Sequence, residues 1–227
     1  MPFKDVNGYK FTISRFDLSW FDKYLKRAPK VILEFGSYDG GDGVLYKNSF
    51  PNCRVISIEA CPERYTIVEK NADKFGIESY NYAVCDFDGK IDFFQVEDTI
   101  SCKNNSYESS FGSSGSINSR TDVYKVKFPH VKEKPSILID SVRLDTFCEM
   151  NEVKNIDLLH CDVEGAEHKV IAGMGSLRPK LLWLEVHLGK EFYGENAYDP
   201  VELNSVLRDM GYIMVESNGS DNLYELR

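Results

Sequence analysis

The 227-residue sequence predicts an α/β fold in which helices cover both faces of a mostly parallel sheet. Three observations carry this prediction. Short apolar runs alternate with helical patterns from residue 30 onward, a glycine turn from Gly36 to Gly40 follows the first run, and the second run ends in the acid Glu59. Ligands of such folds bind outside the carboxyl ends of the parallel strands.

The elements are predicted in order from apolar runs and from residues that begin or end helices. Pro62 suits the first turn of a helix, and Gly76, Gly175 and Gly211 each end one. The predicted strands are 30–36, 54–60, 78–84, 91–96, 124–128, 136–143, 156–162 and 180–187, and the predicted helices are 41–48, 62–75, 145–150, 166–174 and 200–210.

Two hairpins are also predicted. Asp88-Gly89 indicates a tight turn, so the strands on either side of it are expected to pair. Residues 212–216 and 222–226 would form a closing antiparallel hairpin around Asn218-Gly219.

The chain divides into an amino-terminal preface and one main domain. Residues 1–29 are predicted to be a helical preface or lid, because Phe16, Trp20, Phe21 and Tyr24 fall at near-helical spacing and Pro29 follows them. Residues 30–227 form the main domain. Residues 101–119, dense in Ser, Asn and Gly, are predicted to be a loop inserted within it.

Composition excludes several classes of protein. The net charge is −9 and no Lys/Arg cluster is present, which disfavours a nucleic-acid partner. No apolar segment is long enough to span a bilayer, and the start of the chain has no signal core, so a cytoplasmic protein is expected. The six cysteines include no Cys-x-x-Cys pair, which favours buried free thiols.

Four residues predict a nucleoside cofactor: Glu34, Gly36, Gly40 and Glu59. The glycines allow close approach of the backbone, and Glu59 would hold both ribose hydroxyls. Glu34 stands where a carboxylate would repel a pyrophosphate, and the dinucleotide pattern Gly-x-Gly-x-x-Gly is absent. S-adenosylmethionine fits this pattern, because it carries an ammonium, a sulfonium and a ribose but no phosphate.

Further cofactor contacts are predicted around this turn and at the ends of later strands. Ser37, Tyr38 and Asp39 lie in the turn, with Tyr38 and Asp39 expected beside the methionine part. The remaining predicted contacts are Ala60 and Ala83 as walls of the adenine slot, Asp86 as an acceptor for the adenine amine, and Asp162 at the end of a later strand.

Four polar residues are predicted to converge beside the cofactor. Strand alternation places Asp162 and Glu164 on one side, and Glu185 and His187 have the same spacing at the end of the next strand. Glu164 or His187 would accept a proton from a substrate hydroxyl. Alternatively, all four would hold a divalent cation, Mg²⁺ or Mn²⁺. A hydrogen-bonded polar cluster with neither role is the third interpretation.

The other acids and histidines nearby have structural interpretations. Glu167 lies in a helix first turn, where the helix dipole favours an acid. His160 lies inside an apolar strand and is predicted to be a core residue, whereas His168 is predicted to lie on the surface.

The sequence resembles the FkbM family of S-adenosylmethionine-dependent methyltransferases. The matching segments, in the family's order, are 33–40 (LEFGSYDG), 56–62 (ISIEACP), 81–84 (NYAV), 142–147 (VRLDTF), 156–167 (IDLLHCDVEGAE) and 185–187 (EVH). The resemblance implies a class I methyltransferase fold with a seven-stranded sheet. It implies methyl transfer to a hydroxyl, largely of sugars, polyketides and other small metabolites. It places the cofactor on Glu34, Gly36, Gly40 and Glu59, and the reaction near Asp162 and Glu164.

The leading hypothesis is an O-methyltransferase whose partner is a small-molecule or glycan acceptor. A nicotinamide-dependent oxidoreductase is the second hypothesis. The third is a degenerate cofactor-binding fold that is not catalytic and serves as an interaction module. The aromatic residues Phe16, Trp20 and Phe21 would either stack on a sugar ring or form a homodimer contact. A chain of this length would also suit one module of a larger glycan-assembly enzyme.

Overall fold

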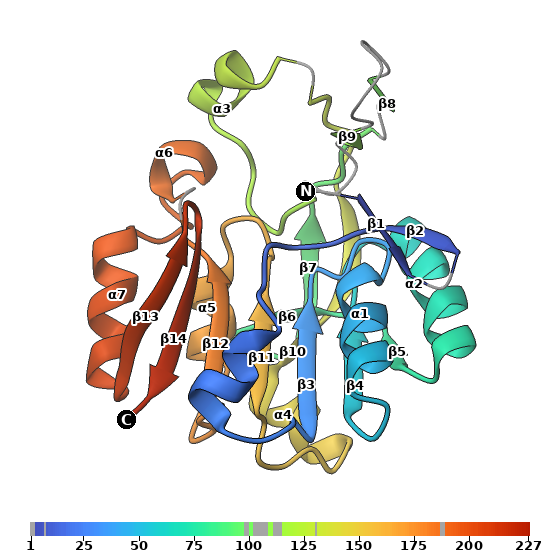
Figure 1. Cartoon of the computed structure of the whole chain (residues 1–227). Coiled ribbons are helices and arrows are strands. Elements are labelled where there is room, and N and C mark those ends of the chain that lie inside the picture. Colours follow the sequence, from blue (N-terminus) through green and yellow to red (C-terminus); the bar gives the residue numbers. More distant parts are fainter. Residues whose placement is uncertain are drawn as a thin grey trace.

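A computed structural model describes residues 3–6, 8–97, 100–101, 109–110, 115–129, 131–186 and 189–227. Its main sheet has seven strands in the order β13-β14-β12-β11-β3-β4-β5 (Figure 1). Their bounds are β3 Val31–Phe35, β4 Arg54–Ile58, β5 Glu78–Tyr80, β11 Leu158–Cys161, β12 Leu181–Glu185, β13 Tyr212–Asn218 and β14 Asp221–Leu226.

The main sheet is mostly parallel, as predicted. Strands β3, β4, β5, β11 and β12 pair in parallel, and β14 pairs antiparallel with both β12 and β13. The closing hairpin turns at Gly219, whose φ is +78°. The strand order and the reversed direction of β14 agree with the seven-stranded class I methyltransferase sheet that the resemblance implies.

Strand alternation divides the core into two layers, one on each face of the main sheet. On β3, Ile32 packs with one layer, and Leu33 and Phe35 with the other. Helices α1 (Gly41–Ser49) and α2 (Pro62–Phe75) contribute to the Ile32 layer. Helices α4 (Leu144–Met150), α5 (Glu167–Ala172) and α7 (Pro200–Asp209) contribute to the opposite layer.

A second, three-stranded sheet corrects two predictions. Its order is β6-β10-β7, formed by Ala83–Cys85, Ile137–Arg143 and Gly89–Phe93. The predicted strand 78–84 is therefore two strands in different sheets, which separate where Asn81 Nδ2 donates to the carbonyls of Glu59 and Ala60. The predicted pairing across Asp88-Gly89 is wrong, because β10 lies between β6 and β7.

The predicted strand 124–128 is also wrong, since residues Asp122–Lys127 form helix α3. Thr121 begins this helix, and its side chain accepts a hydrogen bond from Tyr124 N at 3.3 Å. Alternating apolar and polar residues suggested a strand, but Val126 is 81% exposed and Tyr124 is buried. Helices α3 and α6 (Lys190–Tyr193) contact each other beyond the carboxyl ends of the central strands (Figure 1).

The first 29 residues differ from the helical preface that their spacing predicts. They contain a hairpin of β1 (Phe3–Val6) and β2 (Tyr9–Thr12), and a single π-helical turn, Phe21–Leu25. Phe16 and Phe21 are buried against the main sheet, and the ring of Phe16 lies 5.8 Å from that of Trp183. Neither phenylalanine is therefore exposed to stack on a sugar or to contact a second copy.

Two further observations bear on the class of protein. Among the described residues, no helix has the length and apolar character needed to cross a membrane. The described cysteines at 53, 61, 85, 148 and 161 are buried free thiols, whereas Cys102 lies outside the described residues. The predicted insertion at 101–119 lies partly outside them as well, and Ile100–Ser101 pairs with Ser109–Ser110 as β8 and β9.

Candidate functional site

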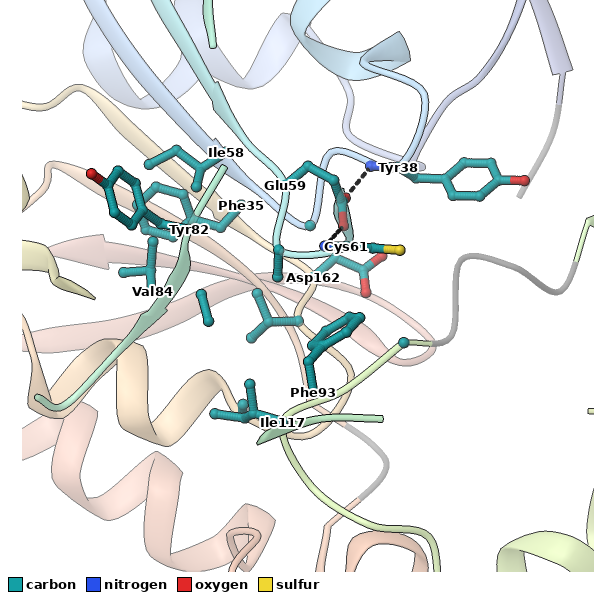
Figure 2. Close-up of a pocket in the computed structure, with 16 residues that line it drawn as sticks. Phe35, Tyr38, Ile58, Glu59, Cys61, Tyr82, Val84, Phe93, Ile117 and Asp162 are labelled. Atoms are coloured by element: carbon teal, nitrogen blue, oxygen red, sulfur yellow. Dashed lines mark hydrogen bonds between the residues drawn. The ribbon is translucent and has the colours of Figure 1, made fainter. Parts of the chain in front are cut away.

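A pocket lies at the carboxyl ends of β3 and β4, where the fold predicts a ligand (Figure 2). Of the predicted cofactor residues, six line it: Gly36, Tyr38, Glu59, Ala60, Ala83 and Asp162. The other predicted cofactor residues are not among those that line it: Glu34, Ser37, Asp39, Gly40 and Asp86.

Gly36 follows β3 directly and packs closely against the backbone at the end of β11. Its φ is +78°, and a Cβ there would lie 1.7 Å from the carbonyl oxygen of Asp162. Its N–H donates to the Ile58 carbonyl at 3.0 Å, which ties the turn to β4. Only glycine permits both the conformation and the close approach of β3 and β11 at this edge.

Glu59 points into the pocket from the end of β4 (Figure 2). One carboxylate oxygen accepts from Tyr38 N and the other from Cys61 N, each at 2.8 Å. Burial raises the pKa of Glu59, and these backbone donors oppose that rise. A carboxylate with two oxygens has lone pairs beyond those two bonds, so Glu59 is held in place and still able to accept hydroxyl groups.

The remaining walls are apolar and come largely from residues that the sequence did not single out. Figure 2 shows Phe93 and Ile117 on one side of the pocket and Ile58 on the other. Gly115 packs so closely that a Cβ would lie 2.5 Å from the Phe93 ring. Ala60 and Ala83 add small side chains, so the pocket combines apolar walls with the fixed carboxylate of Glu59, which suits a nucleoside.

Glu34, Asp39 and Asp42 form a group of acids around the start of α1, which we call the α1 acids. Glu34 is 2% exposed and accepts from Ser57 Oγ. Asp39 accepts from Thr12 N at 2.8 Å and from Gly41 N at 2.9 Å. Asp42 accepts from Ser14 N and from Ser14 Oγ, both at 2.9 Å at closest. All three α1 acids thus accept hydrogen bonds from other residues of the chain.

Burial is the main cause of raised pKa values among the α1 acids. It raises the pKa of Glu34 to about 8, with a further contribution from the charge of Asp42. It raises the pKa values of Asp39 and Asp42 to about 6. Acids here disfavour a pyrophosphate at the adjacent helix N-terminus.

The other predicted cofactor residues outside the pocket lining have structural contacts. Ser37 is buried and its hydroxyl donates to the carbonyls of Glu34 and Ile58. Gly40, with φ +78°, begins α1. Asp86 is exposed, and its carbonyl accepts from Arg143. Contacts from these residues to a cofactor stay predictions.

Asp162, Glu164 and Glu185 form a second group of acids beside the pocket, which we call the β11–β12 acids. One oxygen from each lies within 4.8 Å of the others. The structure thus brings together three of the four residues predicted to be catalytic, while His187 lies outside the described residues. Burial, followed by neighbouring carboxylates, raises the pKa values of Asp162 and Glu185.

Glu164 differs from the other two in its conformation and its partner. Its φ is +54°, in the left-handed region that a non-glycine residue rarely adopts. Tyr193 of α6 donates its O–H to a Glu164 carboxylate oxygen at 2.6 Å. Tyr193 was not predicted as a site residue, because it lies 29 residues after Glu164 in a short helix without a recognisable motif.

The prediction is confirmed for one of the two described histidines near this group and is wrong for the other. His160 is buried in β11 as predicted, its ring nitrogen lies 3.2 Å from the Tyr46 hydroxyl, and burial lowers its pKa to about 3. His168 was predicted to lie on the surface, but it is half-buried with its ring 5.6 Å from that of Tyr198. Glu167 is fully buried at the start of α5, where it accepts from Val163 N at 3.0 Å.

The β11–β12 acids have the donor chemistry of a divalent cation site, because hard oxygen ligands suit Mg²⁺ and Mn²⁺. Asp162, Glu164 and Glu185 would supply the carboxylates. Such a ligand binds a cation only when it has lost its proton, and the charge of a bound cation would itself favour that loss. The same three residues also suit acceptance of hydrogen bonds and of a proton.

The curated protein "2-O-methyltransferase NoeI" of Sinorhizobium fredii is 27% identical to this chain over 150 residues, which are 66% of this chain and 59% of that protein. The alignment thus spans less than two thirds of that relative's length.

Solved structures also resemble the chain at low sequence identity. A putative O-methyltransferase from Klebsiella pneumoniae is 12% identical with a TM-score of 0.45, covering 92% of this chain and 78% of its own. A SAM-dependent methyltransferase from Geobacter sulfurreducens in complex with S-adenosyl-L-homocysteine is 12% identical with a TM-score of 0.41, covering 90% and 66%.

The family comparison covers most of the chain. The model described as the methyltransferase FkbM domain matches residues 34–214. The match includes the glycine turn, Glu59, the β11–β12 acids and Tyr193. The chain therefore belongs to the FkbM family of S-adenosylmethionine-dependent methyltransferases.

Proposed function

We propose that this protein transfers a methyl group from S-adenosylmethionine to a hydroxyl oxygen of a sugar, a glycan or a related small metabolite. The observation that carries the proposal is the position of Asp162, which lines the nucleoside pocket and also belongs to the β11–β12 acids. Carboxylates that accept hydrogen bonds from hydroxyls therefore lie beside the site of the methyl donor. The name of the curated relative, a 2-O-methyltransferase, supports oxygen as the methylated atom.

In the proposed reaction, S-adenosylmethionine supplies an electrophilic methyl group. Glu59 accepts hydrogen bonds from the ribose hydroxyls, and the apolar walls hold the adenine ring. Glu164 accepts the proton of the acceptor hydroxyl as the oxygen forms its bond to the methyl carbon and the carbon–sulfur bond breaks. The products are the methyl ether, S-adenosylhomocysteine and a proton held first by Glu164. A cation on the β11–β12 acids is the alternative means of activating the hydroxyl.

The first test of the proposal is calorimetric titration with S-adenosylhomocysteine and, separately, with NADH. We expect micromolar affinity for the first and none for the second. Binding of NADH alone would favour an oxidoreductase, and binding of neither would favour a non-catalytic module. Transfer of labelled methyl groups to a panel of sugars and glycans then tests the acceptor class.

Glu59→Ala tests the ribose assignment within this pocket. Loss of a carboxylate that binds two hydroxyls is expected to weaken S-adenosylhomocysteine by about a hundredfold. Glu63→Ala is the matched control, because Glu63 is an exposed acid on the neighbouring helix. Equal affinity of Glu59→Ala and the unmodified protein would exclude Glu59 as the ribose ligand.

A further inference from the structure

Glu164 is held by residues that are distant from it in the sequence. The left-handed conformation is unfavourable for a non-glycine residue, so neighbouring structure must maintain it at Glu164. Ser116 Oγ donates to the Glu164 carbonyl at 2.7 Å, and Asn118 Nδ2 donates to the next carbonyl, that of Gly165, at 2.9 Å. Two side chains from one short segment thus fix both peptide groups of this turn.

The segment that carries these side chains is itself anchored. Ser116 pairs with Phe94 through two backbone hydrogen bonds of 2.7 and 3.2 Å. The Ser116 hydroxyl also accepts from Asn118 N at 3.0 Å. Arg120, 5% exposed, is paired with Glu133 at 3.2 Å. The buried state of Ser116, Asn118 and Arg120 indicates a fixed support.

The carboxylate of Glu164 is fixed from another direction. Tyr193 O–H donates to it at 2.6 Å, and the Tyr193 ring covers Gly165, where a Cβ would lie 2.4 Å from a ring carbon. The ring belongs to a buried aromatic group with Tyr124 and Phe192 between α3 and α6. The main chain and the side chain of Glu164 are therefore oriented independently.

We propose that Ser116, Asn118 and Tyr193 are positioning residues that aim the Glu164 carboxylate at the acceptor hydroxyl. This inference rests on the proposed function, because it assumes that Glu164 meets that hydroxyl. The three residues act through Glu164. A small rotation of a reacting group is costly because proton transfer requires hydrogen-bond geometry. Their loss should therefore lower kcat while cofactor affinity is kept.

The test compares variants that remove the side-chain donor to this turn with a variant that keeps it. Ser116→Ala, Asn118→Asp and Tyr193→Phe each remove a donor with little change of size. We expect kcat for methyl transfer to fall about tenfold in each, with the affinity for S-adenosylhomocysteine changed less than twofold. Ser116→Thr keeps the hydroxyl and is expected to recover most of the activity.

The control is Ser119→Ala, because Ser119 is an exposed serine in the same segment and should leave kcat unchanged. Circular dichroism and S-adenosylhomocysteine titration report whether each variant is folded. The inference is overturned if folded Ser116→Ala, Asn118→Asp and Tyr193→Phe all turn over at the unmodified rate, or if Ser116→Thr is no better than Ser116→Ala. Absence of methyl transfer by the unmodified protein on all acceptors would instead overturn the proposed function.

Discussion

The α1 acids and the β11–β12 acids are similar in composition and differ in their surroundings. Each group has three carboxylates near the carboxyl ends of neighbouring strands, and burial raises pKa values in both. Asp39 and Asp42 of the α1 acids are bonded to N–H groups of the chain. By contrast, Asp162 lines the pocket, and Glu164 accepts a hydrogen bond from the Tyr193 hydroxyl.

The contrast teaches that a raised pKa does not by itself distinguish a catalytic carboxylate from a structural one. What separates the two groups is that Asp162 of the β11–β12 acids lines the pocket, whereas none of the α1 acids does. We therefore interpret Asp39 and Asp42 as anchors for the amino-terminal segment, Glu34 as a buried structural acid, and the β11–β12 acids as the reaction centre. The following predictions test this contrast, beginning with the largest effect.

Glu164→Gln should lower kcat by about a hundredfold to ten-thousandfold, because an amide cannot take up the hydroxyl proton. The amide oxygen can still accept from Tyr193, so the melting temperature and the affinity for S-adenosylhomocysteine should change little. Steady-state methyl transfer and calorimetry measure these effects. Glu191→Gln, at an exposed acid on α6, is the control. Turnover of Glu164→Gln within threefold of normal would place the reaction centre elsewhere.

Glu34→Gln should raise the free energy of unfolding at pH 8 and leave it nearly unchanged at pH 4. The folded protein keeps a proton on Glu34 up to about pH 8, and on Asp39 and Asp42 up to about pH 6, whereas the unfolded chain loses these protons near pH 4. The folded state thus binds more protons in this window, so the α1 acids make stability fall as pH rises through it.

Glutamine at position 34 removes the largest of these contributions, which is on the order of a few kcal/mol at about 1.4 kcal/mol per pKa unit. Urea unfolding at pH 4, 6 and 8 gives the three free energies. An unchanged slope of stability against pH would contradict the raised pKa of Glu34. Retained methyl transfer by this variant would support a structural role for the α1 acids.

Ser14→Ala should lower the free energy of unfolding by about 1 to 2 kcal/mol, because it removes the hydroxyl that donates to the Asp42 carboxylate. Turnover per folded molecule should stay within twofold of normal, since Ser14 lies away from the pocket lining. In an Asp42→Asn background, Ser14→Ala should lower the free energy of unfolding by a smaller amount. A double-mutant cycle measures that difference. Full additivity would argue against the Ser14–Asp42 hydrogen bond as an anchor.

The sequence predicted most of what depends on local pattern. The buried parallel strands, the glycine turn and the end of β4 at Glu59 follow from apolar runs and from residues with special backbone freedom. The strand predicted at 124–128 is wrong. Its alternating apolar and polar residues favoured a strand, but Thr121 begins a helix there. The pairing predicted across Asp88-Gly89 is wrong because β10, which follows about fifty residues later in the sequence, lies between β6 and β7.

The support of Glu164 illustrates what sequence patterns do not contain. Ser116 and Asn118 contact the turn across 48 and 47 residues, and Tyr193 across 29. Their residue types are common and their spacing has no periodicity. Only the packing of the second sheet and of α3 against α6 brings them to Glu164.

Removal of divalent cations should have the smallest effect, with turnover after EDTA within about twofold of normal. The proposed proton transfer to Glu164 needs no cation, and the Tyr193 hydroxyl already orients that carboxylate. Methyl transfer by the EDTA-treated protein, with and without each cation added back, is the measurement. A loss that Mg²⁺ or Mn²⁺ restores would make the β11–β12 acids a cation site, whereas turnover without a cation leaves Glu164 to accept the proton.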